Sequence, residues 1–301
     1  MACKDCVTGG IHQGTPLGHE TNILGLNCYT TSPSILARSN GTPTPHDART
    51  AGHIVILTDA LGYKFTNTRL LADRYAARCN AKVYIPDFMD GHGMDTSVFE
   101  SMDILMGHGS SGSGSGSPPG MLQKAGALAH IVAAFIPFLW FTRQAVCEPK
   151  IRTWMAGFRD TVERDSNNGE KDGKMIGAAG FCWGGKYAFL LSRRSAAGGP
   201  LLDCAFTAHP SNLVLPVDAQ MVASPMCVVV GDRDVLLPVG KVEQMKEVLE
   251  AEEGLGCEVT VLPGAAHGFA LRARPGDEEA MAQGVEAENA AVEWFKRYFR
   301  A

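Results

Sequence analysis

The sequence of 301 residues lacks a basic excess and any visible internal repeat. Its 27 Lys and Arg residues stand against 32 Asp and Glu residues, for a formal net charge of -5. A protein that binds nucleic acid through its general charge carries a basic face. We therefore expect no nucleic-acid partner.

The first ten residues, MACKDCVTGG, do not resemble the charged-then-apolar layout of a secretory signal, so we expect none. We expect a cytoplasmic protein whose nine cysteines are mostly reduced. Cys3 and Cys6 form one C-x-x-C pair, but there is no second pair, and His12 and His19 lie at no familiar ligand spacing. We expect no metal and no cofactor, and interpret the N-terminal residues as an arm on the body.

Long runs that are both uncharged and apolar are scarce. The exception is AGALAHIVAAFIPFLWF at residues 125–141, and its length is at the short end for a membrane span. His130 and Pro137 interrupt this run, and Lys124 and Arg143 flank it closely. These features favour a buried helix or a lid helix, and we expect no membrane partner, although docking on a lipid surface stays an alternative.

The sequence does contain an alternation of short apolar runs and helix-like stretches, which is typical of a mostly parallel central sheet with helices on both faces. Strands are predicted at residues 53–58, 81–87, 173–181, 204–210, 226–232 and 257–264, with an antiparallel edge strand within 22–31. Helices are predicted at residues 66–80 (capped by Thr66 or Asn67), 184–194, 240–254 and 278–299. Residues 34–52 are predicted as a long surface loop.

We predict one α/β domain spanning residues 1–301, with an insertion at residues 100–150. The insertion contains GHGSSGSGSGSPPG, a Gly/Ser tract of the flexible-linker type, followed by the apolar run. Sheets of this kind bind ligands at the carboxyl ends of their strands. We therefore interpret the insertion as a cap or lid over that edge.

Residues 177–189, GAAGFCWGGKYAF, hold Cys182 in a frame of glycines between a predicted strand and a predicted helix. This G-x-C-x-G-G pattern has the form of a nucleophile elbow, with cysteine in the usual place of serine. The strained turn needs neighbours almost free of side chains, which Gly180 and Gly184 supply. The dipole of the following helix favours a thiolate, and the backbone N–H of Trp183 would point at a developing oxyanion.

A nucleophile also needs a base and an acid that orients the base. In this architecture the chain order is nucleophile, acid, histidine, each on a loop after a strand. The segment VVVGDRDVLLP offers Asp232 and Asp234, and the segment VLPGAAHGFAL offers His267. We assign the acid to Asp234, because the pattern G-x-x-D-x-x-x-P is where it usually falls, and we expect Asp232 to brace the loop. His209 follows another predicted strand, where it either lines the pocket or caps a turn.

Three segments, GFCWGGKYAF, GDRDVLLP and AAHGFALR, resemble the catalytic segments of the dienelactone hydrolase family. VILTDALGYKFTNTRLLADRYA followed by VYIPDFMDG also resembles the first strand–helix–strand unit of that family, particularly of its fungal members. The resemblance covers roughly residues 1–100 and 174–300. It implies an α/β-hydrolase fold with Cys182 as the nucleophile, His267 as the base and Asp234 as its orienter.

The resemblance also implies auxiliary residues. Asp59 stands where the bacterial enzymes place a glutamate that contacts the resting thiol, and the N–H of Ala60 would be the second oxyanion donor beside that of Trp183. The bacterial enzymes bind a substrate carboxylate through an arginine shortly after the catalytic histidine. Here Leu271 stands at that spacing with Arg272 next to it, which departs from the family pattern.

We therefore expect a cysteine hydrolase that cleaves a lactone, an enol ester or a related activated ester of a small molecule, through a Cys-His-Asp triad and an acyl-enzyme. The same triad could instead serve acyl transfer, cyclisation, thioester release or C–C bond cleavage. A further alternative is an inactive fold that is used as a binding module. A homodimer is left open by the sequence.

Overall fold

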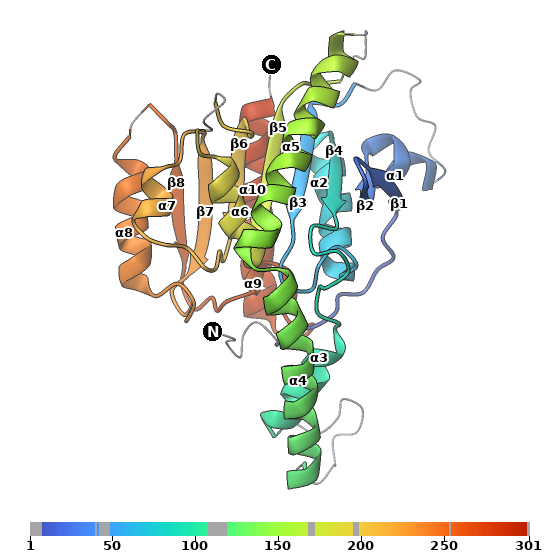
Figure 1. Cartoon of the computed structure of the whole chain (residues 1–301), viewed down its shortest axis with the longest axis vertical. Coiled ribbons are helices and arrows are strands. Elements are labelled where there is room, and N and C mark those ends of the chain that lie inside the picture. The colour runs from blue at the N-terminus through green and yellow to red at the C-terminus, as the bar shows by residue number, and fades with distance from the viewer. Residues whose placement is uncertain are drawn as a thin grey trace.

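The computed structural model describes residues 8–39, 41, 49–107, 119–167, 172–194, 199–252 and 254–299. Its centre is an eight-stranded sheet in the order β1-β2-β4-β3-β5-β6-β7-β8 (Figure 1). The strands are β1 (His19–Ile23), β2 (Leu26–Thr31), β3 (Gly52–Leu57), β4 (Ala81–Pro86), β5 (Ile176–Phe181), β6 (Cys204–Ala208), β7 (Met226–Gly231) and β8 (Glu258–Leu262). Strands β3 to β8 pair in parallel, whereas β1 and β2 are antiparallel to their neighbours.

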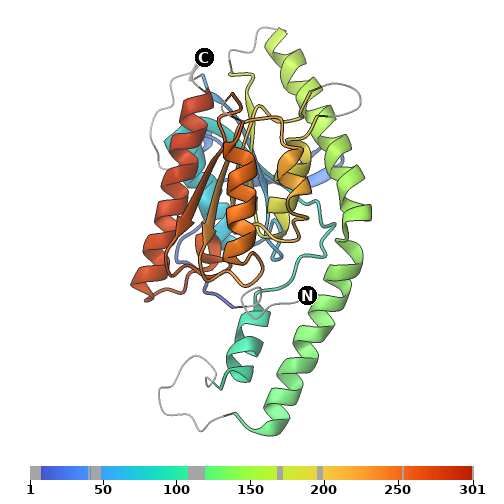
Figure 2. The same cartoon turned by 90° about the vertical axis from the view of Figure 1, so that its left-hand side faces the viewer.

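Helices cover both faces of the sheet. They are α1 (Pro33–Ser39), α2 (Thr66–Cys79), α3 (Ser97–Leu105), α4 (Met121–Phe141), α5 (Gln144–Asn167), α6 (Trp183–Leu191), α7 (Val217–Gln220), α8 (Val239–Glu250), α9 (Phe269–Arg272) and α10 (Glu278–Phe299). Helices α2 and α10 lie on one face, and α5 and α6 lie on the other (Figures 1 and 2). The predicted α/β architecture is confirmed.

The core lies around the middle strands. Every residue of β3, β5 and β7 is buried, as expected for apolar runs covered on both faces. Burial of one Ile or Leu side chain contributes roughly 1.5–3 kcal/mol to folding. This rigid centre fixes the positions of the loops that follow the strands.

The predicted edge strand within residues 22–31 is in fact a hairpin. Strand β1 pairs antiparallel with β2, and β2 pairs antiparallel with β4. Leu24 and Gly25 join the two strands with φ values of 51° and 85°. Two successive residues with positive φ form the tight turn that suits the twist of paired strands, which the polarity pattern alone did not reveal.

The long loop predicted at residues 34–52 is wrong at its start, because α1 occupies Pro33–Ser39. Proline is well suited to the first helical position, where its missing N–H costs nothing. Leu36 of α1 is buried in the hydrophobic core, which stabilises this short helix. Residues 40 and 42–48 of the predicted loop lie outside the described residues, as do Cys3 and Cys6.

The predicted cap of α2 is also wrong. The N-cap residue is Phe65, and no side chain caps the helix. The buried side chain of Asn67 is used elsewhere: it accepts a hydrogen bond from the N–H of His12 (2.8 Å) and donates to the carbonyl oxygens of Gly10 (2.9 Å) and Leu271 (2.8 Å). Asn67 therefore ties the N-terminal segment and α9 to α2.

The insertion at residues 100–150 forms a projecting arm. Helix α4 extends away from the body with α3 packed beside it (Figures 1 and 2). The apolar run does not form a buried helix, because only 22% of its most apolar window is buried. By length and composition α4 could also cross a membrane. The assignment of this insertion as a lid stays a prediction, and residues 108–118 of the Gly/Ser tract lie outside the described residues.

Candidate active site

The turn between β5 and α6 carries Cys182 in a strained backbone conformation, with φ 50° and ψ -111°. Non-glycine residues rarely adopt positive φ, so the surrounding structure must hold this turn in place. A Cβ atom on Gly180 would lie 2.8 Å from the carbonyl oxygen of Gly184, and a Cβ on Gly184 would collide with the backbone of Leu57. The two glycines are therefore required by the close packing of the elbow.

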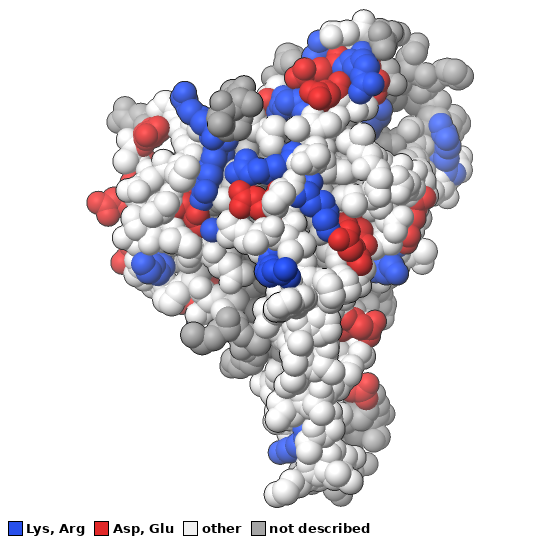
Figure 3. Space-filling view, viewed as in Figure 1, with Lys and Arg blue, Asp and Glu red and all other residues white. Residues whose placement is uncertain are grey.

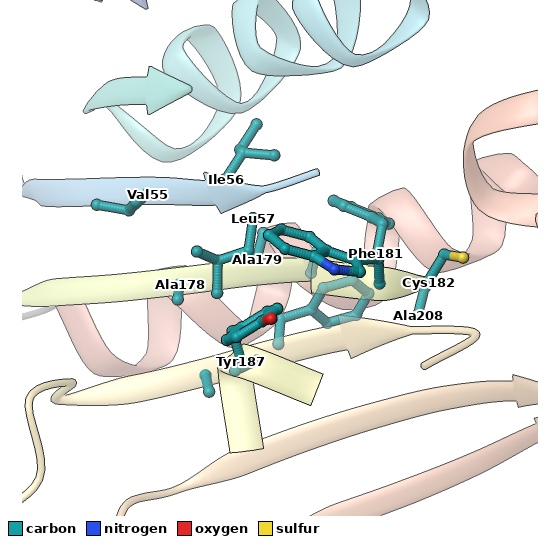
Figure 4. Close-up of a cluster of buried hydrophobic side chains, with 14 of the residues drawn as sticks. Val55, Ile56, Leu57, Ala178, Ala179, Phe181, Cys182, Tyr187 and Ala208 are labelled. Carbon is teal, nitrogen blue, oxygen red and sulfur yellow. The ribbon is translucent and has the colours of Figure 1, made fainter. Parts of the chain in front are cut away.

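The side chain of Cys182 lies just beyond the end of β5, and its sulfur points away from the apolar cluster of β3, β5 and α6 (Figure 4). Its Sγ atom is 3.9 Å from Oγ of Ser211. The backbone of the following loop supports the elbow, because the N–H of Ser211 donates to the carbonyl oxygen of Cys182 (3.0 Å). The loop after β6 therefore forms one wall beside the sulfur.

His267 and Asp234 come from the loops after β8 and β7, and both are buried. The Nδ1 atom of His267 lies 2.8 Å from Oδ2 of Asp234. The other carboxylate oxygen accepts hydrogen bonds from the N–H groups of Leu236 (2.9 Å) and Leu237 (3.3 Å). These bonds fix the carboxylate, which in turn fixes the ring of His267.

Asp232 occupies a different position, on the exposed side of the same loop. Its Oδ1 atom accepts a hydrogen bond from the N–H of Gly264 (2.8 Å), which links the loops after β7 and β8. Of the two aspartates in this loop, it is Asp234 that contacts His267.

The charges of its neighbours dominate the protonation of His267. Burial alone would lower the pKa of its imidazole, but the interactions with Cys182 and Asp234 outweigh burial and raise the pKa to about 10. An imidazole with this pKa is charged at neutral pH, and an adjacent imidazolium favours a thiolate. The arrangement can hold a thiolate–imidazolium pair.

Asp59 follows β3 and forms a buried ion pair with Arg272, whose Nε lies 3.6 Å from Oδ2 of Asp59. Burial raises the pKa of Asp59 to about 6, because desolvation outweighs the lowering effect of Arg272. Cys182 also raises this pKa, which places Asp59 within electrostatic reach of the sulfur. The structure thus brings Asp59 and Arg272 together at the elbow.

His209 at the end of β6 is fully buried, with a φ of 40°. Its ring centroid lies 5.1 Å from that of His267 and 5.4 Å from that of Phe269. Neither ring nitrogen has a hydrogen-bond partner among the described residues. Burial and the neighbouring charge of His267 lower the pKa of His209 well below its usual value, so this imidazole is neutral.

The two expected oxyanion donors lie on neighbouring strand ends. Trp183 follows the elbow and Ala60 follows Asp59 after β3, and the N–H of Gly184 donates to the carbonyl oxygen of Thr58 (2.9 Å). The indole of Trp183 donates to the carbonyl oxygen of Thr142, at the joint between α4 and α5 (3.0 Å). This bond connects the arm to the residue beside Cys182.

The site is closed to solvent. Only 3% of the Cys182 surface is exposed. A cavity of about 230 Å³ between α6 and the joint of α4 and α5 is lined in part by Trp183, Phe138 and Asn212. Another cavity, of about 210 Å³, is lined in part by His267 and Arg272. A substrate therefore needs a movement of the residues between one of these cavities and Cys182 to reach the sulfur.

Sequence reasoning missed two contributors to this region. Ser211 is two residues from His209 in the same strand-end loop, which was the available signal for its position near the sulfur. Thr142 contributes a backbone carbonyl, for which no sequence motif exists.

The fold and the strained strand-to-helix turn define an α/β-hydrolase. The profile of the dienelactone hydrolase family matches residues 41–299, which is most of the chain. The chain therefore belongs to the dienelactone hydrolase family, and it is a hydrolase of that kind.

Similar proteins agree with this assignment. The chain is 25% identical to "Hydrolase tropI" of Talaromyces stipitatus, over 98% of this chain and 96% of that protein. It is 30% identical to a "Putative carboxymethylenebutenolidase" of Methylorubrum extorquens, over 43% of this chain and 45% of that protein. A crystal structure of a putative dienelactone hydrolase from Klebsiella pneumoniae has the same fold, with a TM-score of 0.59 and 20% identity, over 93% of this chain and 98% of that one.

Proposed function

We propose that the protein is a cysteine hydrolase that cleaves a lactone, an enol ester or a related activated ester of a small molecule. The observation that carries the proposal is the buried hydrogen bond between His267 and Asp234, in a site where Cys182 and Asp234 raise the pKa of His267. An imidazole held in this way can pass a proton to and from a reacting group.

In the proposed reaction the thiolate of Cys182 attacks the carbonyl carbon of the ester. The developing oxyanion accepts hydrogen bonds from the N–H groups of Ala60 and Trp183, each typically worth about 3 kcal/mol. His267 then donates its proton to the departing oxygen, which leaves an acyl-enzyme. Finally His267 takes a proton from a water molecule that attacks the thioester, and the thiolate of Cys182 is released with the acid.

A thiolate nucleophile suits esters with good leaving groups, because the acylation step must expel an oxygen that is otherwise more basic than the thiolate. The names of the bacterial relatives support a lactone as the substrate class. The substrate should nevertheless differ from that of those enzymes. Arg272 stands one residue after the position of their carboxylate-binding arginine, and its side chain pairs with Asp59 instead.

Acyl transfer by the same residues is the second candidate, favoured by the burial of Cys182. A closed site keeps bulk water from a reactive intermediate, so another acceptor can take the acyl group. Reaction in ¹⁸O-labelled water distinguishes the two, since only hydrolysis places solvent oxygen in the released acid.

The decisive variant is Cys182→Ala. We expect it to abolish turnover of an activated ester such as a p-nitrophenyl ester and to prevent any acyl adduct in the intact mass. Cys204→Ala, at another buried cysteine in β6, should retain the wild-type kcat. Comparable kcat values for the Cys182 variant and the wild type would remove the nucleophile from the proposal.

Asp234→Asn and Asp232→Asn form a matched pair from one loop. We expect Asp234→Asn to lower kcat by at least about 100-fold, because the amide would hold His267 in the wrong tautomer. Asp232→Asn should change kcat less than about fivefold, since its contact is to the backbone of Gly264. Steady-state kinetics with folded protein checks both, and the reverse order would reassign the acid.

A further inference from the structure

His209 is a buried imidazole that the proposed reaction does not use. It lies directly after β6 and is fully buried. Neither Nδ1 nor Nε2 has a hydrogen-bond partner among the described residues. Burial of a polar group without a partner is unfavourable, and such groups in folded proteins are usually completed by a ligand or by water.

Two hydrogen bonds hold the segment around His209 against the nucleophile turn. The N–H of Cys182 donates to the carbonyl oxygen of Ala208 (3.4 Å), and the N–H of Ser211 donates to the carbonyl oxygen of Cys182 (3.0 Å). Ala208 accordingly lies close to Cys182 in Figure 4. His209 lies between these two contacts, and its own N–H donates to the carbonyl oxygen of Val229 (2.9 Å). The backbone therefore fixes His209 beside Cys182.

The backbone conformation of His209 is also strained. Its φ of 40° lies in a region that residues other than glycine rarely adopt. A Cβ atom on Gly185 would lie 2.6 Å from Cβ of Pro210, so α6 packs closely on the residue after His209. Strain of this kind persists only where the surrounding structure holds it, and it is concentrated at functional sites.

Three aromatic rings surround the imidazole of His209. Their centroids lie 5.1 Å away for His267, 5.4 Å for Phe269 and 6.0 Å for Phe181. The two phenyl rings offer no ordinary hydrogen bond, and Nδ1 of His267 is bound to Asp234. The ring of His209 thus borders the catalytic imidazole without pairing with it.

The chemistry of His209 favours a hydroxyl group as its partner. Burial and the charge of His267 lower the pKa of His209 well below its usual value, so the ring is uncharged. An uncharged imidazole has one donor nitrogen and one acceptor nitrogen, and a hydroxyl group can pair with either. A hydrocarbon group would leave both nitrogens unpaired.

A carboxylate fits this position less well. The two nearby cations are already paired, His267 with Asp234 (2.8 Å) and Arg272 with Asp59 (3.6 Å). Helix α4, which borders one of the two cavities, belongs to an arm that is almost free of charge on the face shown in Figure 3. A buried carboxylate would therefore lack a cation of its own, which is far less favourable than burial of a paired hydroxyl group.

We propose that His209 is a specificity-determining residue, and that it binds a hydroxyl group on the acyl part of the substrate, close to the scissile carbonyl. The inference rests on the proposed function, because it places that carbonyl at Cys182. The acyl part is the relevant one, since it stays bonded to Cys182 after the leaving group has departed. A site that hydrogen-bonds a substrate hydroxyl discriminates against the analogue that lacks it.

Two matched pairs of esters test the proposal. The p-nitrophenyl ester of 3-hydroxybutyrate is compared with that of 3-methylbutyrate, and the ester of 2-hydroxybutyrate with that of 2-methylbutyrate. In each pair a methyl group replaces the hydroxyl group, and each kcat/KM is divided by the rate of spontaneous hydrolysis of the same ester. The wild type should prefer the hydroxy ester of at least one pair by about tenfold or more.

Variants of His209 should change this preference in opposite degrees. His209→Phe should bring the ratio within the pair close to one, because the phenyl ring offers no hydrogen bond. His209→Gln should retain part of the preference, because its amide still has a donor and an acceptor. A ratio is insensitive to the fraction of folded enzyme, so a destabilised variant remains informative.

His53→Phe is the matched control. His53 is also a buried imidazole, but it lies near the start of β3, opposite Ile176 at the start of β5, and therefore at the far end of these strands from Cys182. This variant should keep the wild-type ratio. A preference that survives His209→Phe, or that His53→Phe removes equally, overturns the proposal. A wild-type ratio close to one in both pairs also overturns it, and would mean that water alone pairs with His209.

Binding separates this inference from the proposed function. Cys182→Ala should bind the preferred hydroxy ester about tenfold or more tightly than its methyl counterpart in isothermal titration calorimetry, and adding His209→Phe should equalise the two. Turnover by the wild type without either preference overturns the role of His209 alone. A binding preference without turnover by the wild type overturns the hydrolysis alone. If none of the four esters is bound or turned over, both proposals are overturned.

Discussion

The buried carboxyl group of Asp59 makes the stability of the fold depend on pH. Its pKa is raised by burial from 3.8 to about 6. Because the folded value lies above the unfolded value, the contribution of Asp59 to stability is complete below pH 3.8 and is lost as the pH rises through 6. A shift of this size corresponds to about 3 kcal/mol.

Asp59→Asn removes this titration. Its free energy of unfolding should therefore increase relative to the wild type by up to about 3 kcal/mol between about pH 4 and pH 7, as measured by urea unfolding at each pH. Asp232→Asn, at an exposed carboxylate, should show a nearly constant difference over the same range. A constant difference for Asp59→Asn as well would show that its carboxyl group titrates normally.

Replacing His209 should have opposite effects on the stability of the fold and on activity. Burial of two unpaired ring nitrogens is unfavourable, so His209→Phe should stabilise the fold by about 1 kcal/mol. If His209 lines the substrate pocket, which is one of the two alternatives that the sequence leaves open, the same variant should lower kcat/KM by about tenfold or more. Thermal unfolding and steady-state kinetics measure the two effects, and an unchanged kcat/KM would make His209 a packing residue.

At the scale of single residues, the sequence was sufficient to choose the candidate site residues but not to predict all of their contacts. Cys182, His267 and Asp234 could be placed because each follows a strand, and strand ends converge at one edge of the sheet. The pairing of Arg272 with Asp59 could not be predicted, because it depends on how the short helix α9 turns its side chains toward the end of β3.

At the scale of elements, the side chain of Asn67 on α2 holds α9 and the N-terminal segment in place by hydrogen bonds. Asn67→Ala would leave the carbonyl oxygens of Gly10 and Leu271 and the N–H of His12 without their partner. We expect a loss of about 3 kcal/mol in the free energy of unfolding, measured by chemical denaturation.

The control is Asn22→Ala in the exposed hairpin, where the side chain accepts a hydrogen bond from the N–H of Gly25. Because this bond is solvent-exposed, its loss should cost less than about 1 kcal/mol. Equal losses for the two variants would mean that Asn67 does not couple α9 to α2.

The element pattern of the sheet was predictable because buried parallel strands leave long apolar runs. The errors arose where a local conformation has only a weak sequence signal. The residue type of Leu24 gives no indication of its positive φ. Asn67 is a residue type that often caps a helix, but here its side chain forms tertiary hydrogen bonds instead. The N-terminal pair Cys3 and Cys6 is not tested by the described residues.

At the scale of the whole molecule, composition could not distinguish a buried helix from an exposed one. The run at residues 125–141 has the same hydropathy in either case, and only the arrangement of α3 and α4 reveals that most of α4 projects from the body (Figure 2). The insertion could be located along the chain because it lies between two predicted strands, whereas its role as a lid stays a prediction.

The hydrogen bond between the Trp183 indole and the Thr142 carbonyl spans the foot of the arm and the nucleophile turn. Thr142 directly follows the 21-residue α4. A tilt of this helix would therefore be transmitted through the hydrogen bond to Trp183, the residue next to Cys182. The length of α4 thus bears on the geometry of the nucleophile turn.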